Sequence, residues 1–187
     1  MLQSGLCAYD QLIFLLAMKF WSNLLKPDLT LGESILHLSP QIVRDCGLRG
    51  LVLDVDETLV PFRYTDVSDE LTDWLREMRE QVEALWLVSN NINAVRIGSI
   101  AESLDLPYIH FAGKPSRRKL ARAVEAMQIP PAQVGMVGDR LLTDVLAGNR
   151  LGMYTILVEP MLVPGDRPRV SHVRSLETWI SKTFGHR

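Results

Sequence analysis

Apolar and polar positions come in blocks along this chain, and the blocks predict strands and helices in alternation. Five short apolar runs have the length and character of buried strands, at 50–55, 84–89, 108–111, 134–138 and 153–158. Helical segments are predicted between and around them, at 30–38, 68–81, 93–104, 116–127, 141–151 and 176–183. Ser68 and Ser116 are suitable helix N-caps, and Gly152 is a suitable helix stop. Repeated strand–helix units predict an α/β domain with a mainly parallel, five-stranded sheet and right-handed crossovers.

The apolar run from Leu12 to Trp21 stands before this alternation. It is shorter than the roughly 20 residues that span a bilayer, and it lacks the basic start and cleavage site of a signal peptide. Two interpretations stay open: a helix packed on the domain, or an interfacial helix with Lys19 and Trp21 at the level of lipid headgroups. We therefore expect an N-terminal helix over 1–25 and a single domain over 26–187.

The composition restricts the size of the domain, the partners it can bind and the compartment in which it can work. The 187 residues suffice for one good core, and 47% hydrophobic with 22% charged residues is ordinary for a globular protein. A net charge of -2 argues against nucleic acid as a partner. Cys7 and Cys46 form no zinc pattern and no disulfide framework, which favours a reducing compartment such as the cytoplasm, with or without peripheral attachment to a membrane.

Polar side chains follow four of the predicted strands. Asp54 and Asp56 come after the first, Ser89 and Asn90 after the second, Lys114 after the third and Asp139 after the fourth. In an open parallel sheet the carboxyl ends of the strands share one edge, and ligands bind there. The pattern therefore predicts one polar crevice.

The residue types in this crevice suit phosphoryl transfer. Asp54 and Asp56 are two apart, so they can face the same side, and a cation would relieve their repulsion. With Asp139 as a third carboxylate, the ligand set suits Mg²⁺. Asp54 can attack phosphorus while Asp56 protonates the leaving oxygen and then activates water.

The other polar residues can assist this chemistry. Ser89, the backbone N–H groups near Asn90, and Lys114 can donate to the phosphoryl oxygens. Asp144, five residues after Asp139, can hold metal-bound water or orient Lys114.

The segments DVDET (54–58), Ser89, Lys114-Pro115 and GDRLLTD (138–144) resemble, in order, the four motifs of the haloacid dehalogenase (HAD) superfamily. The resemblance implies a Rossmann-like fold with helices on both faces of the sheet. It also implies a nucleophile and metal ligand at Asp54, an acid/base at Asp56 that binds metal through its carbonyl, and a third metal ligand at Asp139. Thr58 would position the motif, Ser89 and Lys114 would bind phosphate, and Asp144 would support the metal site.

The spacing between the motifs leaves room for one helix at each usual point of cap insertion, so we expect no cap domain and an open site. The runs LLKPDLTLGESI, DVDETLVPF, SNN and AGKPSRRKL resemble subfamily IIIA, the YqeG-type branch related to phosphatidylglycerophosphate phosphatases. The resemblance implies a phosphorylated lipid headgroup as substrate. The open site leaves a protein, a nucleic acid end or a sugar phosphate as alternatives, and a signalling module that is phosphorylated on aspartate without turnover is the alternative from another class.

Overall fold

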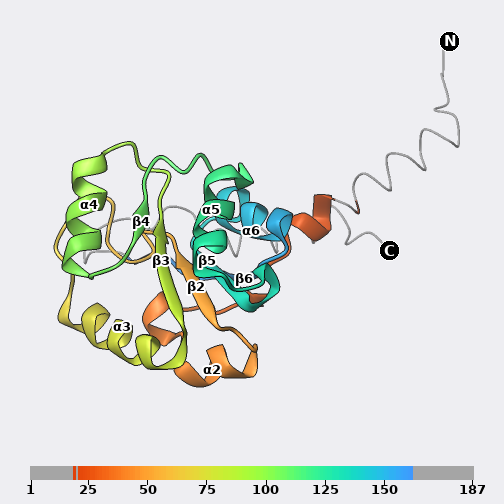
Figure 1. Cartoon of the computed structure of the whole chain (residues 1–187), viewed down its shortest axis with the longest axis horizontal. Helices are drawn as coiled ribbons and strands as arrows, with labels where there is room; N and C mark the ends of the chain where they lie inside the picture. Colours follow the sequence, from red (N-terminus) through yellow and green to blue (C-terminus); the bar gives the residue numbers. More distant parts are fainter. Residues whose placement is uncertain (1–18, 20, 162–187) are drawn as a thin grey trace, which may run out of the picture.

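The computed structural model describes residue 19 and residues 21–161, in which six strands form one parallel sheet (Figure 1). The order across the sheet is β1-β6-β5-β2-β3-β4. The strands are β1 (Leu29–Thr30), β2 (Gly50–Leu53), β3 (Ala84–Val88), β4 (Tyr108–Ile109), β5 (Val134–Gly138) and β6 (Tyr154–Leu157). The predicted α/β class is confirmed, and all five predicted strands are present.

The number of strands is a correction, because the sequence predicts five. Strand β1 is the outermost strand of the sheet, beside β6. Its residues Leu29 and Thr30 pair with Ile156 and Leu157 of β6. Two residues are too few to show a hydrophobic period, so this strand is invisible in the pattern. The helix predicted over 30–38 is also wrong: a 3-10 turn, η1 (Ile35–His37), precedes a short helix, α2 (Pro40–Asp45).

Helices cover both faces of the sheet, as predicted. They are α3 (Asp69–Gln81), α4 (Ala94–Ser103), α5 (Arg117–Met127) and α6 (Leu146–Leu151), with the 3-10 turn η2 (Pro131–Gln133) before β5. The side chains of Ser68, Asn93 and Ser116 accept hydrogen bonds from the first turns of α3, α4 and α5. The helix predicted over 141–151 is divided, because its first part is a π-helical turn, η3 (Leu141–Val145).

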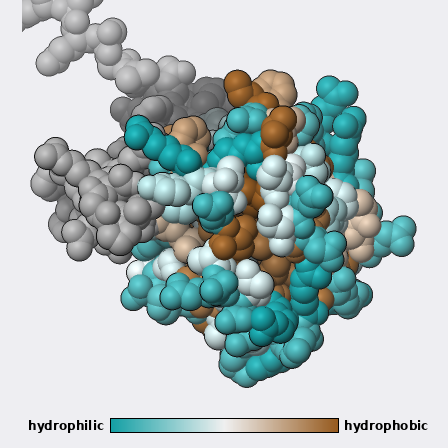
Figure 2. All heavy atoms as spheres, turned by 90° about the vertical axis from the view of Figure 1, so that its left-hand side faces the viewer, coloured by the Kyte–Doolittle hydropathy of each residue, from teal (hydrophilic) through white to brown (hydrophobic). Residues whose placement is uncertain are grey.

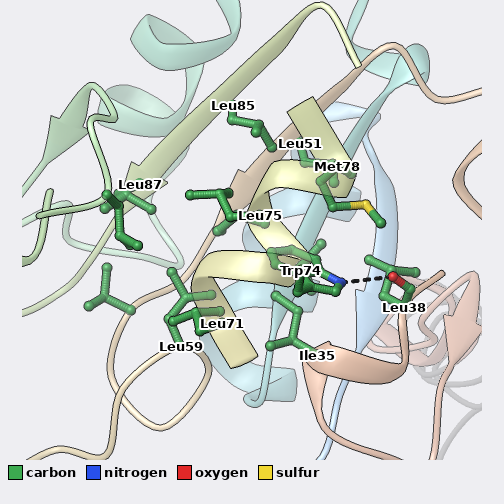
Figure 3. Packing of buried hydrophobic residues seen from close by; sticks show 14 of the residues in the cluster. Ile35, Leu38, Leu51, Leu59, Leu71, Trp74, Leu75, Met78, Leu85 and Leu87 are labelled. Atoms are coloured by element: carbon green, nitrogen blue, oxygen red, sulfur yellow. Dashed lines mark hydrogen bonds between the residues drawn. The ribbon is translucent and has the colours of Figure 1, made fainter. Parts of the chain in front are cut away.

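Two large hydrophobic cores and one small cluster of Leu141, Val145 and Leu157 hold these layers together in the described part of the chain. Leu51 and Leu53 of β2 face a core formed with η1, α2, α3 and α4, whereas Val52 faces a second core formed with α5 and α6. Alternate residues of a strand point to opposite faces, so a strand buried on both sides reads as a continuous apolar run. In the first core, Trp74 Nε1 donates a 2.9 Å hydrogen bond to the carbonyl of Leu38 (Figure 3).

The connections after β2 and β3 are short. Residues 54–83 contain α3 as their one helix, and residues 89–107 contain α4, so neither connection carries a further domain. The edge that holds the strand ends is therefore uncapped at both points, as the motif spacing predicts.

Parts of the predicted organisation lie outside the described residues. These are the helix predicted over 176–183 and most of the apolar run from Leu12 to Trp21. Residue 19 and residues 21–24 are helical, with a turn at Leu25. Over residue 19 and residues 21–161, none of the helices has the length and apolar character needed to cross a bilayer.

Candidate active site

The polar residues that follow the strands converge, as the sequence predicts. Seven of the eight buried polar side chains in the described part of the chain are predicted site residues: Asp54, Asp56, Thr58, Ser89, Lys114, Asp139 and Asp144. Burying so many charged groups costs free energy unless they are paired or bind an ion, so this concentration indicates a functional site. Asn90 lies beside them, half-buried.

Lys114 is the central cation of the site. Its Nζ lies 2.6 Å from Asp54 Oδ1 and 2.7 Å from Asp144 Oδ1, and it donates a hydrogen bond of 2.7 Å to the carbonyl of Val88. Burial lowers the pKa of Lys114, but the negative charges of Asp144 and Asp54 outweigh burial and raise that pKa above its ordinary value. The amine is therefore a permanent positive charge next to Asp54.

Three carboxylates form a cluster that can hold a metal ion. Oxygens of Asp54, Asp139 and Asp144, hereafter the carboxylate cluster, lie within 4.8 Å of one another. Hard oxygen donors at such separations fit Mg²⁺, which takes carboxylate ligands and keeps several of its waters. The sequence assigns Asp144 a supporting role, and the structure brings its carboxylate as close as the other two. The side chain of Asp56 lies outside the cluster, and the metal contact implied for its carbonyl stays a prediction.

The pKa values of Asp54 and Asp139 lie above the ordinary value for an aspartate. Burial raises the pKa of Asp54 to about 6, although Lys114 acts to lower it. Burial, reinforced by the charges of Asp54 and Asp144, raises the pKa of Asp139 to about 8. A divalent ion among these oxygens would offset both the burial and the repulsion between the carboxylates, and so lower both pKa values.

Thr58 links two members of the cluster. Its Oγ1 lies 3.5 Å from Asp54 Oδ2 and 3.4 Å from Asp139 Oδ1. Glu57, between Asp56 and Thr58, has a φ of 66°, so the chain reverses sharply after the strand and brings Thr58 under the carboxylates. Arg140 Nη2 pairs with Glu57 Oε2 at 3.0 Å and fixes this turn from the end of β5.

Asp56 is held by residues of the β3–α4 connection. Its Oδ2 accepts hydrogen bonds from Ser89 Oγ at 3.2 Å and from Asn91 Nδ2 at 3.1 Å. Its Oδ1 pairs with Arg96 Nη1 at 2.5 Å. Arg96 also donates to the carbonyls of Pro61 and Tyr64, and so ties the loop after the first motif to α4.

Sequence reasoning missed Arg96, which lies 40 positions after its partner. One signal was available: a basic residue in the first turn of a helix is unfavourable with the helix dipole. Such a residue calls for a nearby carboxylate. Asn93 is the cap of α4, since its side chain accepts from the N–H of Arg96 at 3.1 Å. Ser89 and Asn90 therefore do not cap α4, and their side chains contact Asp56 and the backbone of Lys114 instead.

Asn90 and Lys114 join two strand ends by a reciprocal pair of hydrogen bonds. Asn90 Nδ2 donates to the carbonyl of Lys114 at 2.9 Å, and the Lys114 N–H donates to Asn90 Oδ1 at 2.7 Å. The pair fixes the backbone that carries the lysine. Phosphate binding by the Asn90 region stays a prediction.

The parallel sheet and this set of buried acids around one lysine define a hydrolase of the HAD type. A family model described as HAD-hydrolase-like matches residues 111–160. The probable phosphatase YqeG of Bacillus subtilis is 37% identical over 129 residues, which are 69% of this chain and 74% of that protein. The chain belongs to the YqeG-type phosphatases, subfamily IIIA of the HAD superfamily. It is accordingly a phosphatase.

Two further comparisons add to this assignment. The chloroplastic phosphatidylglycerophosphate phosphatase 1 of Chlamydomonas reinhardtii is 28% identical over 166 residues, which are 82% of this chain and 61% of that protein. The crystal structure of an uncharacterized protein from Listeria monocytogenes superposes with a TM-score of 0.51 at 19% identity, over 66% of this chain and 87% of that one. At this identity, the likeness to the Listeria structure supports only the assignment of the fold.

Proposed function

We propose that this phosphatase is a Mg²⁺-dependent phosphomonoesterase that acts on phosphatidylglycerophosphate through an aspartyl-phosphate on Asp54. The observation that carries the proposal is the environment of Asp54. One of its oxygens lies 2.6 Å from the Lys114 ammonium, and it belongs to the carboxylate cluster. A carboxylate beside positive charge is poised to meet a phosphoryl group that carries negative charge.

Magnesium bound by Asp54, Asp139 and Asp144 would supply the charge that offsets these carboxylates and the phosphoryl oxygens. In the first step an oxygen of Asp54 attacks phosphorus, and the bond from phosphorus to the leaving oxygen breaks. Asp56 gives its proton to that oxygen, so the product leaves as an alcohol. Lys114 and Ser89 are the donors nearest to the transferring group.

In the second step Asp56 takes a proton from water, and the oxygen of that water attacks phosphorus. The bond to Asp54 breaks, so inorganic phosphate leaves and the free carboxylate returns. Both oxygens of Asp56 are engaged in the structure, by Ser89 and Asn91 on one side and Arg96 on the other. Arg96 is the one described partner of Oδ1, so a second lone pair of this oxygen is left for the proton that Asp56 exchanges with the leaving group or water.

The lipid substrate is supported by two considerations. The relative from Chlamydomonas is a phosphatidylglycerophosphate phosphatase by name. The connections after β2 and β3 carry no further domain, so a headgroup that stays anchored in a bilayer can reach the strand ends. The same openness leaves a protein, a nucleic acid end or a large sugar phosphate as the second candidate substrates.

The test measures phosphate released from phosphatidylglycerophosphate in mixed micelles, with and without Mg²⁺. We expect release that requires Mg²⁺ and is lost in Asp54→Asn, while Asp66→Asn, an exposed acid on the same connection, keeps it. A phosphoenzyme that carries label from the substrate, is cleaved by hydroxylamine and is absent in Asp54→Asn would support the covalent step. Robust hydrolysis of phosphoproteins, nucleic acid ends or sugar phosphates without hydrolysis of the lipid would reject the proposed substrate.

A further inference from the structure

Most of the large exposed apolar side chains among the described residues belong to segments that start at the carboxyl ends of the strands, where the site lies. In the described part of the chain eight large apolar side chains are exposed, and six of them belong to segments that follow strands β2 to β5. We call these six the apolar rim: Phe62, Tyr64, Ile92, Val95, Phe111 and Leu142. Because the strands are parallel, all of these segments start from the same edge of the sheet. Figure 2, turned about the vertical axis of Figure 1, shows some apolar spheres projecting at its upper edge and a larger apolar area in the middle of the face.

Folding of the domain does not account for the apolar rim. The side chains of Ile92 and Val95 are 77% and 80% exposed, so they contribute little to either core. Phosphate binding does not account for it either, because the polar groups that suit phosphate are buried below. Apolar side chains gathered around a polar site are typical of a surface that meets another apolar phase.

Basic residues accompany the apolar rim. The first turn of α5 consists of Arg117, Arg118 and Lys119 and contains no acidic residue. Positive charge at a helix N-terminus is opposed by the helix dipole. Hydrogen bonds to backbone carbonyls account for part of the run, since Arg117 donates to Arg150 and Lys119 donates to Phe111. The whole chain carries a net charge of -2, so general composition does not explain the run.

Cations also lie over both phenylalanines of the rim. Lys119 Nζ is 5.0 Å from the ring centre of Phe111, and Arg96 Cζ is 5.9 Å from that of Phe62. The pair of Phe111 and Lys119 suits the boundary between acyl chains and anionic headgroups, where the ring enters the apolar layer and the cation lies near the phosphates. Arg96 is held by Asp56 and serves only to orient the ring of Phe62.

We propose that the apolar rim docks on a bilayer that contains anionic phospholipids, with the basic start of α5 contacting their headgroups. This inference deepens the proposed function and rests on it, because a lipid phosphatase needs its site at the membrane surface. Apolar contact combined with positive charge favours this partner over a neutral apolar surface. The connections after β2 and β3 carry no domain that would hold the rim away from the bilayer.

Flotation of the full chain with vesicles tests the docking without any substrate. We expect the protein to float with phosphatidylcholine vesicles that contain phosphatidylglycerol and much less with phosphatidylcholine alone. Ile92→Ser combined with Val95→Ser should weaken this binding by about tenfold or more, since two exposed apolar side chains are lost. Tyr108→Ser replaces an exposed side chain outside the rim and should bind like the parent chain. Unfolding curves verify that all variants fold.

A depth measurement separates the rim from any other part of the chain that contacts lipid. A nitroxide is attached to Val95→Cys or to Tyr108→Cys in a chain whose two native cysteines are replaced by serine. With anionic vesicles, the label at position 95 should collide more with dissolved oxygen and less with a water-soluble nickel reagent. The label at position 108 should stay in water.

Three results would overturn the proposal. They are no binding of the parent chain to anionic vesicles, undiminished binding of the Ile92→Ser, Val95→Ser variant, and a label at position 95 that stays in water. Self-association that this variant abolishes, without vesicle binding, would instead assign the rim to a protein interface. Docking as expected with no hydrolysis of phosphatidylglycerophosphate would uphold the rim and reject the substrate, so the two failures are distinguishable.

Discussion

Arg96 and Asp56 are joined by an ion pair of 2.5 Å in which both side chains are nearly buried. The pair connects the acid/base candidate with α4. The same guanidinium donates to the carbonyls of Pro61 and Tyr64, so one side chain orients both the carboxylate and the loop that follows it. Arg96 is therefore a positioning residue for Asp56.

Replacing Arg96 by alanine should lower kcat by about tenfold or more, because Asp56 loses its orientation. It should also destabilise the fold by about 2 to 4 kcal/mol, since a nearly buried carboxylate loses its charged partner. Arg96→Lys should restore part of the stability but less of the rate, because an ammonium cannot make the forked contacts of a guanidinium. Arg76→Ala, which removes an exposed ion pair with Asp73, is the control and should change neither. Unchanged kcat in Arg96→Ala would contradict the positioning role.

Without a bound cation, the stability of the protein should fall as pH rises from about 4 to about 8. Folding raises the pKa of Asp54 to about 6 and that of Asp139 to about 8, from an ordinary value of 3.8. Across this window the folded state binds more protons than the unfolded state, so raising the pH favours unfolding. Thermal unfolding in chelator at several pH values measures the slope. Added Mg²⁺ should raise the midpoint most at the alkaline end, and a flat profile would contradict this account.

Asp139→Asn should separate stability from activity. Removing one of three crowded carboxylates relieves repulsion, so the metal-free variant should unfold at a higher temperature than the parent chain near pH 7.5. The same change removes a ligand, so Mg²⁺ should no longer stabilise the protein, and activity should fall by about 100-fold or more. Midpoints with and without Mg²⁺, measured beside kcat, test both halves. An Asp139→Asn variant that is still stabilised by Mg²⁺ would place the ion elsewhere.

Gly138 is needed for the close approach of Asp144. A Cβ at this position would lie 2.5 Å from Asp144 Cγ, which is too close for two carbon atoms that are not bonded to each other. Gly138→Ala should push Asp144 away from Lys114 and lower kcat by about tenfold or more. In the control Gly98→Ala the new Cβ meets the Tyr108 hydroxyl at 3.0 Å, a flexible side chain that can move. That control should keep its activity, and equal losses in both variants would refute the argument.

Trp74→Phe should affect stability alone. The change removes the hydrogen bond from Nε1 to the carbonyl of Leu38 and leaves space in the first core. We expect a loss of about 2 to 4 kcal/mol in the free energy of unfolding, read from urea titration, with kcat unchanged at temperatures where the variant is folded. A loss of kcat in the fully folded variant would show that packing in the first core also affects the geometry of the active site.

The convergence of Asp54, Ser89, Lys114 and Asp139 could be predicted because each stands at the end of an apolar run. Parallel strands bring their ends together whatever lies between them. What could not be predicted depends on packing. The closeness of Asp144 to the other carboxylates requires the π-helical turn η3, and Asp56 turns toward Arg96 because α4 packs beside the first motif. Neither feature produces a hydrophobic periodicity that could be recognised in the sequence.

Strand β1 has a consequence for shortened forms of the chain. Leu29 and Thr30 cover the outer edge of β6, and Asp28 secures them by accepting hydrogen bonds from the N–H and hydroxyl of Thr155. A truncation that begins at residue 25 keeps this protective strand, whereas one that begins at residue 31 leaves the outer side of β6 unpaired, with β5 still on its inner side. Bare sheet edges recruit other chains and cause aggregation. Poor solubility after the longer deletion would thus reflect an uncovered edge and carry no information about membrane binding.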